Sequence, residues 1–384
     1  MKKICVVVQS RANYGRIKSV MSAIAEHKKL DLQLIVGASA ILERFGNPLE
    51  IIKKDGFNPS GVIYSILEGE NPETMAKSTG MGIIELSSQF RHLKPDIVLT
   101  VADRFETMST AIAASYMNIL LAHTQGGEVT GSIDESVRHA ITKLSHIHFP
   151  STNKAKRNII KMGENENNVF LTGCPSLDLI NDLDLNLKPD FFHKYGGVGC
   201  KINPKDKYIV VLQHPVTTEF NSTNSHIKET LKAVKNISER NIQVVFLWPN
   251  VDAGSDKISK YIRSFRESNN LKNFAFFKNF EPEDYIRLIN NCSCLVGNSS
   301  SGIREGSYLG IPSVNIGNRQ SGREKSLNTI NVENNSIEII NAINKQLSNG
   351  KYPRSNLYGD GNAGKIIANV LAENDFNLIK KLNY

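Results

Sequence analysis

The sequence predicts an α/β fold of two doubly wound, Rossmann-like domains that face a cleft, and three observations lead to this prediction. Short β-branched runs alternate with helical stretches along most of the chain, which is typical of parallel sheets covered on both faces. A length of 384 residues favours two cores over one. The alternation fades around residues 182–207, where Asn, Asp, Lys, Pro and Gly predominate, as expected of an interdomain connection.

The elements follow in order along both halves. In the first half, strands are predicted at residues 3–8, 32–36, 62–65, 95–101, 119–123, 148–150 and 169–172, and helices at 14–26, 41–55, 72–92, 108–116, 133–146 and 154–162. In the second half, strands are predicted at residues 208–212, 244–248, 274–277, 294–296 and 313–316, with helices between them. We therefore expect an N-terminal domain over residues 1–185 and a C-terminal domain over residues 186–384, whose last helix can pack back on the N-terminal domain.

Composition argues against several classes of protein. The apolar run after Lys3 stops at Gln9, too early for a signal peptide, and no stretch approaches the roughly 20 apolar residues of a membrane span. Five cysteines, far apart in the chain, argue against a disulfide framework. The net charge of +8 is scattered and accompanies no nucleic-acid motif. We expect a cytoplasmic protein that binds neither membranes nor nucleic acid; its basic excess either attracts an anionic nucleotide or belongs to a solvated surface.

A loop of small residues, Gly297-Asn298-Ser299-Ser300-Ser301-Gly302, follows the predicted strand at 294–296 and precedes a helix. Converging backbone N–H groups, serine hydroxyls and the helix start suit a phosphate, although an ordinary serine N-cap gives the same pattern. Glu305 lies about one and a half turns further on. It could accept the hydroxyls of a ribose, or pair with Arg304.

Basic side chains follow several of the predicted strands. Arg11 follows the first strand, Arg104 the strand at 95–101, and His214 the strand at 208–212. Ligands of open α/β sheets collect at the carboxyl ends of the strands, so these groups suit phosphate recognition. For Arg104 the alternative is a local ion pair with Asp103, and a single histidine is more often structural than catalytic.

The stretch from Leu121 to His148 concentrates ionisable groups in a loop and the helix after it. Glu128, Asp134 and Glu135 are its acid/base candidates. Asp134 and Arg138 are four residues apart and share a helix face, so mutual support is the structural alternative. The three histidines of the stretch lack metal-ligand spacing, and the chain has neither a GxSxG elbow nor a GxGxxG fingerprint after a strand. We expect no metal and no redox cofactor.

Eight segments together are similar to the hydrolysing UDP-N-acetylglucosamine 2-epimerases. They are SRANYG, VADRFE, HTQGGEVTGSIDESVRHAITKLSHIH, GCPSLD, LQHPVTTE, WPNVDAGS, GNSSSGIRE and GNRQSGRE, in order from residue 10 to about residue 323. The resemblance implies a glycosyltransferase-B-like fold, conversion of UDP-GlcNAc to ManNAc and free UDP on the way to sialic acids, and no metal or redox cofactor. It also implies elimination of the nucleotide to a glycal followed by water addition, and assembly as a homodimer or homotetramer. Close relatives act on 2,4-diacetamido-trideoxy sugar nucleotides in legionaminic acid synthesis.

The same resemblance implies roles for individual residues. Asp103 and Asp134 match catalytic carboxylates, with Asp103 the candidate base at C2 and Asp134 the acid/base on the water side. The matching nucleotide-binding positions are Arg11, His214, Asn250, Ser299, Ser300, Glu305 and Arg319. In this set, His214 matches a position near the diphosphate and Glu305 a position on the ribose. UDP is the expected nucleotide, with GDP as the alternative.

Three residues depart from the family pattern. Gln125 stands where the family usually has the first Glu of His-Ile-Glu-Gly-Gly-Glu, and glutamine cannot transfer a proton at neutral pH. Ala102 replaces Gly or a similar small residue, and Asn13 replaces an Asp. Either Glu128 or Asp134 takes over the acid/base role, or the sugar differs. We expect an altered sugar preference, such as a 4-acetamido-6-deoxy sugar.

Two other functions are compatible with the sequence. A retaining glycosyltransferase shares the architecture and the nucleotide site, but it needs an acceptor. In a non-catalytic nucleotide-sugar-binding protein, Gln125 would mark an inactive site.

Overall fold

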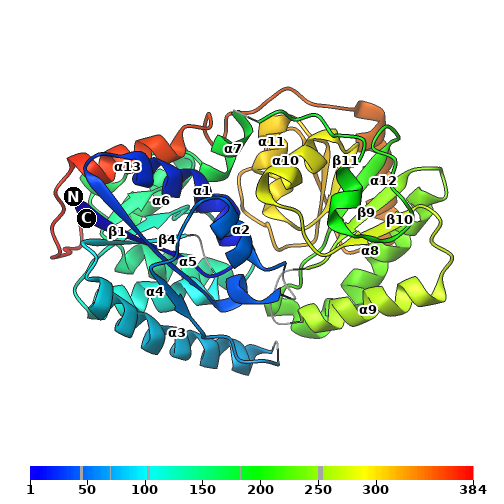
Figure 1. The fold of residues 1–384 in the computed structure, drawn as a ribbon. Helices are drawn as coiled ribbons and strands as arrows, with labels where there is room; N and C mark the ends of the chain where they lie inside the picture. Colours follow the sequence, from blue (N-terminus) through cyan, green and yellow to red (C-terminus); the bar gives the residue numbers. More distant parts are fainter. Residues whose placement is uncertain (44–45, 70, 102–103, 182, 250–253, 384) are drawn as a thin grey trace. The chain divides into compact units, whose positions relative to one another are not determined.

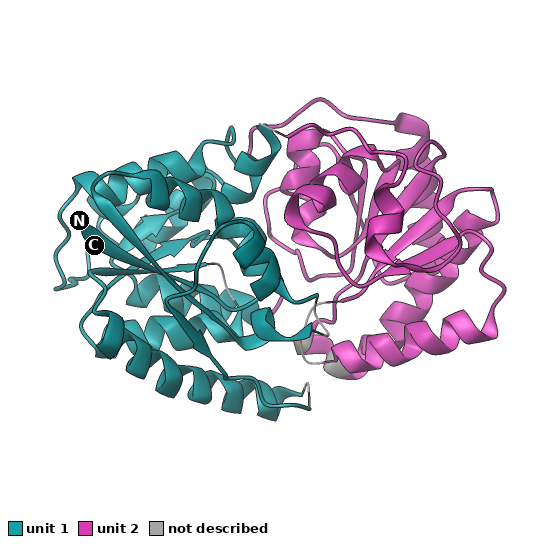
Figure 2. Cartoon of the chain, in the orientation of Figure 1, with its two compact units in different colours: residues 1–129, 133–182, 358–384 teal, residues 130–132, 183–357 magenta. Residues whose placement is uncertain are grey.

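The computed structural model describes residues 1–43, 46–69, 71–101, 104–181, 183–249 and 254–383. The contacts divide the chain into two compact units (Figure 2). Unit 1 contains Met1–Val129, Ile133–Asp182 and Tyr358–Tyr384, and unit 2 contains Thr130–Ser132 and Leu183–Leu357. Residues 358–384 follow unit 2 in sequence and pack in unit 1.

Unit 1 is built on a six-stranded sheet in the order β3-β2-β1-β4-β5-β6, with parallel pairings. Its strands are β1 (Lys2–Val8), β2 (Leu30–Gly37), β3 (Gly61–Ile63), β4 (Ile97–Val101), β5 (Leu120–Thr124) and β6 (Ile147–Phe149). On β1, Ile4, Val6 and Val8 belong to one core, while Cys5 and Val7 belong to another. Because successive side chains point to opposite faces and both faces are buried, the strand is apolar from Ile4 to Val8.

Helices cover both faces of this sheet (Figure 1). Side chains of α1 (Arg11–Glu26), α2 (Pro48–Lys54) and α13 (Ala363–Glu373) enter one core. Side chains of α3 (Pro72–Leu93), α4 (Phe105–Tyr116) and α5 (Ile133–Leu144) enter the other. Two shorter helices, α6 (Asn153–Lys161) and α7 (Asp178–Asn181), follow β6 in the chain.

Two predicted elements of unit 1 are only partly present. The helix expected over residues 41–55 is replaced by a 3-10 turn at Ala38–Ile41 and by α2, which begins at Pro48. Gly46 and Asn47 have positive φ angles of 88° and 47°, which a right-handed helix cannot accommodate. The strand expected over residues 169–172 is reduced to an isolated bridge between His148 and Val169.

The last helix is fixed to unit 1 at its start. The Asp178 carboxylate accepts hydrogen bonds from the backbone N–H groups of Ala363 (3.0 Å) and Gly364 (2.6 Å), the first residues of α13. A Cβ atom on Gly364 would lie 2.8 Å from the backbone of Ser19 in α1. Glycine at this position therefore lets α13 pack closely on α1, and Ile367 then enters the unit 1 core.

Unit 2 has a seven-stranded sheet in the order β13-β12-β11-β8-β9-β10-β7. Its strands are β7 (Val198–Gly199), β8 (Tyr208–Leu212), β9 (Gln243–Leu247), β10 (Phe274–Phe277), β11 (Cys294–Gly297), β12 (Ser313–Ile316) and β13 (Thr329–Val332). Only β7 pairs antiparallel among the described strands. From β8 onward the winding repeats that of unit 1, so both sheets are doubly wound. The edge strands are short, with β7 exposed and β13 mostly half-buried, which explains why the sequence pattern missed them.

Helices α8 (Thr223–Ser238), α9 (Ser255–Ser268) and α12 (Ser336–Asn349) contribute to the main core of unit 2. Two further helices, α10 (Pro282–Asn291) and α11 (Glu305–Leu309), follow β10 and β11. In the connection from unit 1, Phe191 stacks on Phe280 with ring centroids 5.6 Å apart. No helix among the described residues is long and apolar enough to cross a membrane.

Candidate active site

In each sheet the winding reverses beside the first strand of the parallel order, which is β1 in unit 1 and β8 in unit 2. The reversal lies between β1 and β4 in unit 1 and between β8 and β11 in unit 2. Ligands of doubly wound sheets bind at the carboxyl ends of the strands on either side of this point. Arg11, Arg104, His214 and Ser299 each follow one of these four strands, so four sequence-predicted residues lie at the positions where such sheets bind ligands.

The serine loop after β11 gathers hydroxyl groups. Ser299 caps the 3-10 turn Ser300–Gly302, and its Oγ accepts a hydrogen bond from the Ser301 N–H group at 3.4 Å. The Ser301 hydroxyl lies 2.7 Å from both the Ser299 hydroxyl and the Tyr285 hydroxyl. The serine cap and the hydroxyl cluster are therefore both present. Because α11 has only five residues, hydroxyls and backbone donors would contribute more to anion binding than a helix dipole.

Glu305 is the first residue of α11 and is 8% exposed. Its Oε2 atom is buried and has no hydrogen-bond partner among the described residues. A buried carboxylate oxygen without a partner is costly. The position therefore suits a carboxylate that accepts hydrogen bonds from the hydroxyls of a ligand.

His214 follows β8 and is 4% exposed. Its backbone N–H donates to Asn298 Oδ1 at 2.8 Å, and its carbonyl accepts from Asn298 Nδ2 at 2.8 Å. Arg319, which follows β12, donates from Nη1 to the Asn298 carbonyl at 3.2 Å. Asn298 belongs to the predicted loop of small residues but was not itself among the predicted site residues; its signal in the sequence is a polar residue directly after the glycine that ends a central strand.

A pocket of unit 2 adjoins the same loop. Its lining includes Gly297, Ser299, Gly302 and Asn315 from the ends of β11 and β12 and the turn between them. The Asn315 amide donates to Asn331 Oδ1 at 3.0 Å, while its own Oδ1 is buried without a partner among the described residues.

The loop after β1 in unit 1 is braced internally. Ser10 caps α1 by accepting from the Asn13 N–H group at 3.2 Å. Asn13 is fully buried; its Oδ1 accepts from the Gln9 N–H group at 3.3 Å, and its amide donates to the Val101 carbonyl at 3.5 Å. Asparagine in place of aspartate therefore provides a donor that links the β1 and β4 loops. This local role accounts for Asn13 without reference to a sugar.

Arg104 has a buried acidic partner. Its Nε donates to Glu106 Oε1 at 2.6 Å, and both side chains are less than a tenth exposed. Arg104 thus combines a strand-end position with an ion pair inside unit 1. The local pair that the sequence suggested was with Asp103, which lies outside the described residues, as do Ala102 and Asn250.

Gln125 directly follows β5 in a left-handed conformation, with a φ angle of 61°, and is fully buried. Its N–H donates to the Phe149 carbonyl at 3.0 Å, and its side-chain amide donates to Cys174 Sγ at 3.3 Å. Two residues on, a Cβ atom at Gly127 would lie 2.2 Å from the Ala155 carbonyl oxygen. The glycine pair therefore turns the chain tightly against α6.

Glu128 and Asp134 lie on either side of the start of α5. Glu128 is 5% exposed, and its carbonyl accepts from Arg138 Nη1 at 2.8 Å. Arg138 is fully buried on α5. Asp134 is half-buried in the first turn of that helix. Arg138 therefore braces the turn that presents Glu128.

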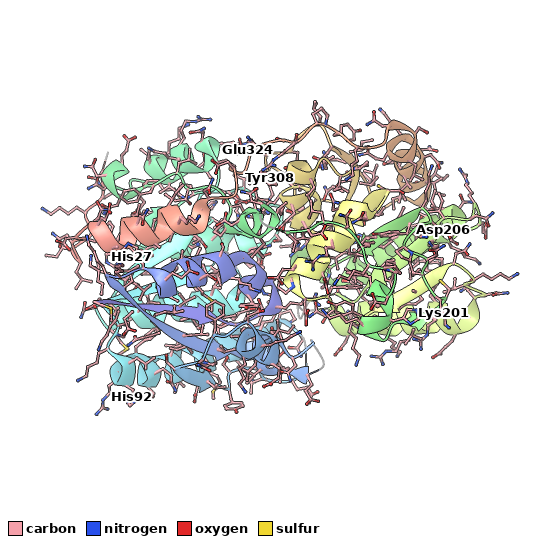
Figure 3. All side chains as sticks on the ribbon, turned by 45° about the horizontal axis from the view of Figure 1, so that its top comes forward. His27, His92, Lys201, Asp206, Tyr308 and Glu324 are labelled. Carbon is pink, nitrogen blue, oxygen red and sulfur yellow. The ribbon has the colours of Figure 1, made fainter. Side chains whose placement is uncertain are left out.

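The histidines around β6 have structural surroundings. His146 Nδ1 accepts from the Leu121 N–H group at 3.1 Å, and its Nε2 donates to the Leu378 carbonyl at 3.0 Å. His148 Nε2 donates to Glu164 Oε2 at 3.1 Å. Burial lowers the pKa of both imidazoles, so both are neutral at pH 7. His92, by contrast, is exposed in the last turn of α3 (Figure 3).

Within the part of the chain that the structure describes, no three His, Cys, Asp or Glu side chains are grouped as ligands for a metal ion. Two doubly wound sheets, with hydroxyls, cations and buried acids after their central strands, define a protein of the glycosyltransferase-B-like class. The solved UDP-GlcNAc 2-epimerase of Neisseria meningitidis, bound to UDP-GlcNAc, shares this fold: the TM-score is 0.80 at 18% identity, over 97% of this chain and 100% of that one.

Sequence comparison identifies the family. The family model described as UDP-N-acetylglucosamine 2-epimerase matches residues 22–372, and the chain belongs to this family. It is 33% identical over 361 residues to the UDP-N,N'-diacetylbacillosamine 2-epimerase (hydrolyzing) of Legionella pneumophila, covering 94% of this chain and 93% of the relative. It is 31% identical over 338 residues to the GDP/UDP-N,N'-diacetylbacillosamine 2-epimerase (hydrolyzing) of Campylobacter jejuni, covering 88% and 86%.

Proposed function

We propose that the protein is a hydrolysing 2-epimerase of a nucleotide-linked N-acetylated sugar. It eliminates the nucleotide to leave a glycal and then adds water, so that the free sugar is inverted at C2. Family membership over residues 22–372 is the observation that carries this proposal. The chemistry requires a base for the C2 proton, donors or cations for the departing diphosphate, and an acid/base group for water.

The strand ends of unit 2 supply the nucleotide-binding groups in this proposal. His214, Arg319 and the hydroxyls of Ser299 and Ser300 bind the diphosphate, and Glu305 accepts the ribose hydroxyls. The unpartnered Glu305 oxygen supports this assignment, because a bound ribose would satisfy it. We assign Arg11 and Asn250 to the same ligand by resemblance, and Arg104 as a further cation whose charge is shared with its buried acidic neighbour.

The carboxylates of unit 1 act on the sugar in this proposal. Asp103 removes the C2 proton, and Asp134, with Glu128 as its neighbour, serves the water side. Replacing Asp103 with Asn should abolish nucleotide release while UDP affinity changes less than about threefold, because the acid is needed for the proton and not for the diphosphate. Calorimetry and a nucleotide-release assay separate these quantities. Undiminished turnover would remove Asp103 from the mechanism.

For the sugar we propose a 2,4-diacetamido-2,4,6-trideoxy substrate linked to UDP in preference to GDP. The relatives from Legionella pneumophila and Campylobacter jejuni carry names of this substrate class. Gln125 stands at the position that departs from the family pattern, and it is fully buried directly after β5. The product would feed the synthesis of legionaminic or sialic acids.

One experiment tests both the reaction and the substrate. The protein is incubated in deuterated water with UDP-GlcNAc, UDP-N,N'-diacetylbacillosamine or the GDP-linked counterpart, and the free sugar is followed by NMR. We expect release without any acceptor, deuterium at C2, and the fastest turnover with UDP-N,N'-diacetylbacillosamine. Release that depends on an acceptor would favour a glycosyltransferase, and tight binding without product would favour a non-catalytic binding protein. Equal rates with UDP-GlcNAc would reject the sugar preference.

We also propose that the protein is a cytoplasmic homodimer or homotetramer. Apolar side chains on and beside α3 support assembly, because Tyr64 is 74% exposed and Ile84 is 62% exposed. Large apolar groups of this kind often lie in contacts between subunits. Light scattering coupled to size exclusion measures the mass in solution, and the mass of a single chain would contradict the proposal.

A further inference from the structure

The geometry points to Asn298 as a positioning residue: we propose that it sets the position of His214 and Arg319 and thereby the affinity for the nucleotide diphosphate. The inference rests on the proposed function, because that function makes these two groups the ligands of the diphosphate. Asn298 is fully buried, follows β11 and lies between the two groups that it contacts.

The side chain of Asn298 binds the backbone of His214 at two points. Its Oδ1 accepts from the His214 N–H group and its Nδ2 donates to the His214 carbonyl, both at 2.8 Å. One amide thus satisfies both polar groups of a single residue. Two hydrogen bonds fix orientation as well as distance, so the start of the loop after β8 cannot rotate without breaking one of them.

The backbone pairing of β8 with β11 stops before His214, so a side chain is needed to hold that residue. The pairing of β8 with β11 ends where Leu212 faces Gly297, and the Asn298 N–H group still donates to the Leu212 carbonyl at 3.2 Å. Gly297 has a φ angle of 134°, and a Cβ atom on it would lie 2.1 Å from the Leu212 oxygen. The chain therefore bends away at Gly297. The Asn298 side-chain amide takes the place of the next backbone hydrogen bonds of the sheet and connects the end of β11 to His214.

The backbone of Asn298 contacts the loop on its other side. Its carbonyl accepts from Arg319 Nη1 at 3.2 Å and from the Gln320 side-chain amide at 2.9 Å. Both donors follow β12, and β8, β11 and β12 are adjacent in the sheet. Asn298 therefore links three neighbouring strand ends, and a displacement at this residue would move an imidazole and a guanidinium together.

The chemistry of the contact requires an asparagine. The amide presents one donor and one acceptor at the distance of a backbone peptide group. Alanine would leave the N–H and the carbonyl of His214 buried without their side-chain partner, which is costly. Serine keeps a polar group but is too short to reach both atoms.

A matched control lies in the same unit. Gln346 is also a fully buried amide that binds two backbone carbonyls, of Ser313 at 2.7 Å and Asn328 at 2.8 Å. Its partners lie at the amino-terminal ends of β12 and β13, whereas His214 follows the carboxyl end of β8. Gln346→Ala should therefore lower stability without displacing the diphosphate ligands.

The test compares the wild-type protein, Asn298→Ala and Gln346→Ala by calorimetric titration with UDP and by NMR of labelled histidine in the free protein. A His214→Gln variant identifies the His214 signal. We expect Asn298→Ala to shift that signal and to weaken UDP binding by about tenfold, while Gln346→Ala does neither at a similar loss of thermal stability. Asn298→Ser provides the same comparison if the alanine variant does not fold.

The two readouts separate the inference from the function on which it rests. An unmoved His214 signal in a folded Asn298 variant overturns the positioning role, and so does an unchanged UDP affinity. Wild-type protein that binds no UDP would contradict the proposed nucleotide site. In that case, the His214 signal alone decides whether Asn298 positions the loop.

Discussion

The buried carboxylate of Glu164 ties the C-terminal tail to the body of unit 1, and its removal is a sharp test of this packing. Only 3% of the side chain is exposed. One oxygen accepts from His148 Nε2 at 3.1 Å and from Lys380 Nζ at 2.6 Å, and the other accepts from Lys143 Nζ at 2.6 Å. Lys380 also donates to the backbone carbonyls of Thr142, Lys143 and Ser145. Glu164 therefore joins α5 and β6, which carry Lys143 and His148, to Lys380, which lies more than two hundred residues further along the chain.

The pKa of Glu164 gives the size of the stability that its carboxylate contributes. Burial alone would raise the pKa of Glu164, but the three hydrogen bonds outweigh it and lower the pKa from 4.5 to about 2. This difference corresponds to roughly 3 kcal/mol of stability at neutral pH. Because the folded pKa is the lower one, the contribution is complete above pH 4.5 and is lost as the pH falls toward 2. It should be about half its full size near pH 3.

Glu164→Gln removes this contribution. We expect a fall in the melting temperature at pH 7 of roughly 6–12 °C, since about 1 kcal/mol corresponds to 2–4 °C in a domain of this size. Glu166→Gln is the matched control, because Glu166 is 68% exposed and lies 3.5 Å from Lys156. Circular dichroism at pH 7 and at pH 4 measures both variants. Equal melting temperatures for the two, or a gap that widens in acid, would refute the reasoning.

Three further predictions concern unit 1. Asp178→Ala should destabilise the protein by about 1–2 kcal/mol in urea unfolding, because α13 loses its N-terminal acceptor; an unchanged midpoint would contradict the capping role. Gly127→Ala should cost more than about 2 kcal/mol, because its φ angle is 75° and the added carbon would collide with Ala155, and wild-type melting would show that the turn relaxes. Gln125→Glu should raise turnover of UDP-GlcNAc relative to the diacetamido substrate at unchanged UDP affinity; an unaltered ratio of rates would separate Gln125 from sugar preference.

The central strands were predictable because burial on both faces leaves a strong signal. β1 from Ile4, β4 apart from Thr100, β8 and β11 are apolar runs, each followed within a few positions by polar residues. In a parallel sheet those polar residues fall at one edge. This is why His214 and Ser299 could be selected as site residues before their neighbours were known. The short edge strands β7 and β13 bury too little to leave such a signal.

The orientation of the site groups was not predictable from the pattern. For Arg104 the sequence suggested a strand-end cation or a local ion pair with Asp103, whereas the structure shows a buried pair with Glu106 two residues later. For Asn13 the sequence suggested an altered sugar preference, which stays a prediction; the structure adds that its amide links two loops of unit 1. Each outcome depends on which side chains packing brings within about 3 Å, and spacing along the chain does not give that distance.

The sequence by itself determined the alternation of strands and helices, the parallel sheets, the family and the polar groups after the central strands, since these follow from local periodicity and short motifs. The sequence allowed the last helix to pack on the N-terminal domain, but only the tertiary structure decided that Lys380 meets Glu164 and that Asn298 holds His214. These contacts join residues that are 84 or more positions apart. No local pattern encodes such pairs, because they form only when the sheets and helices have fixed where the distant segments meet.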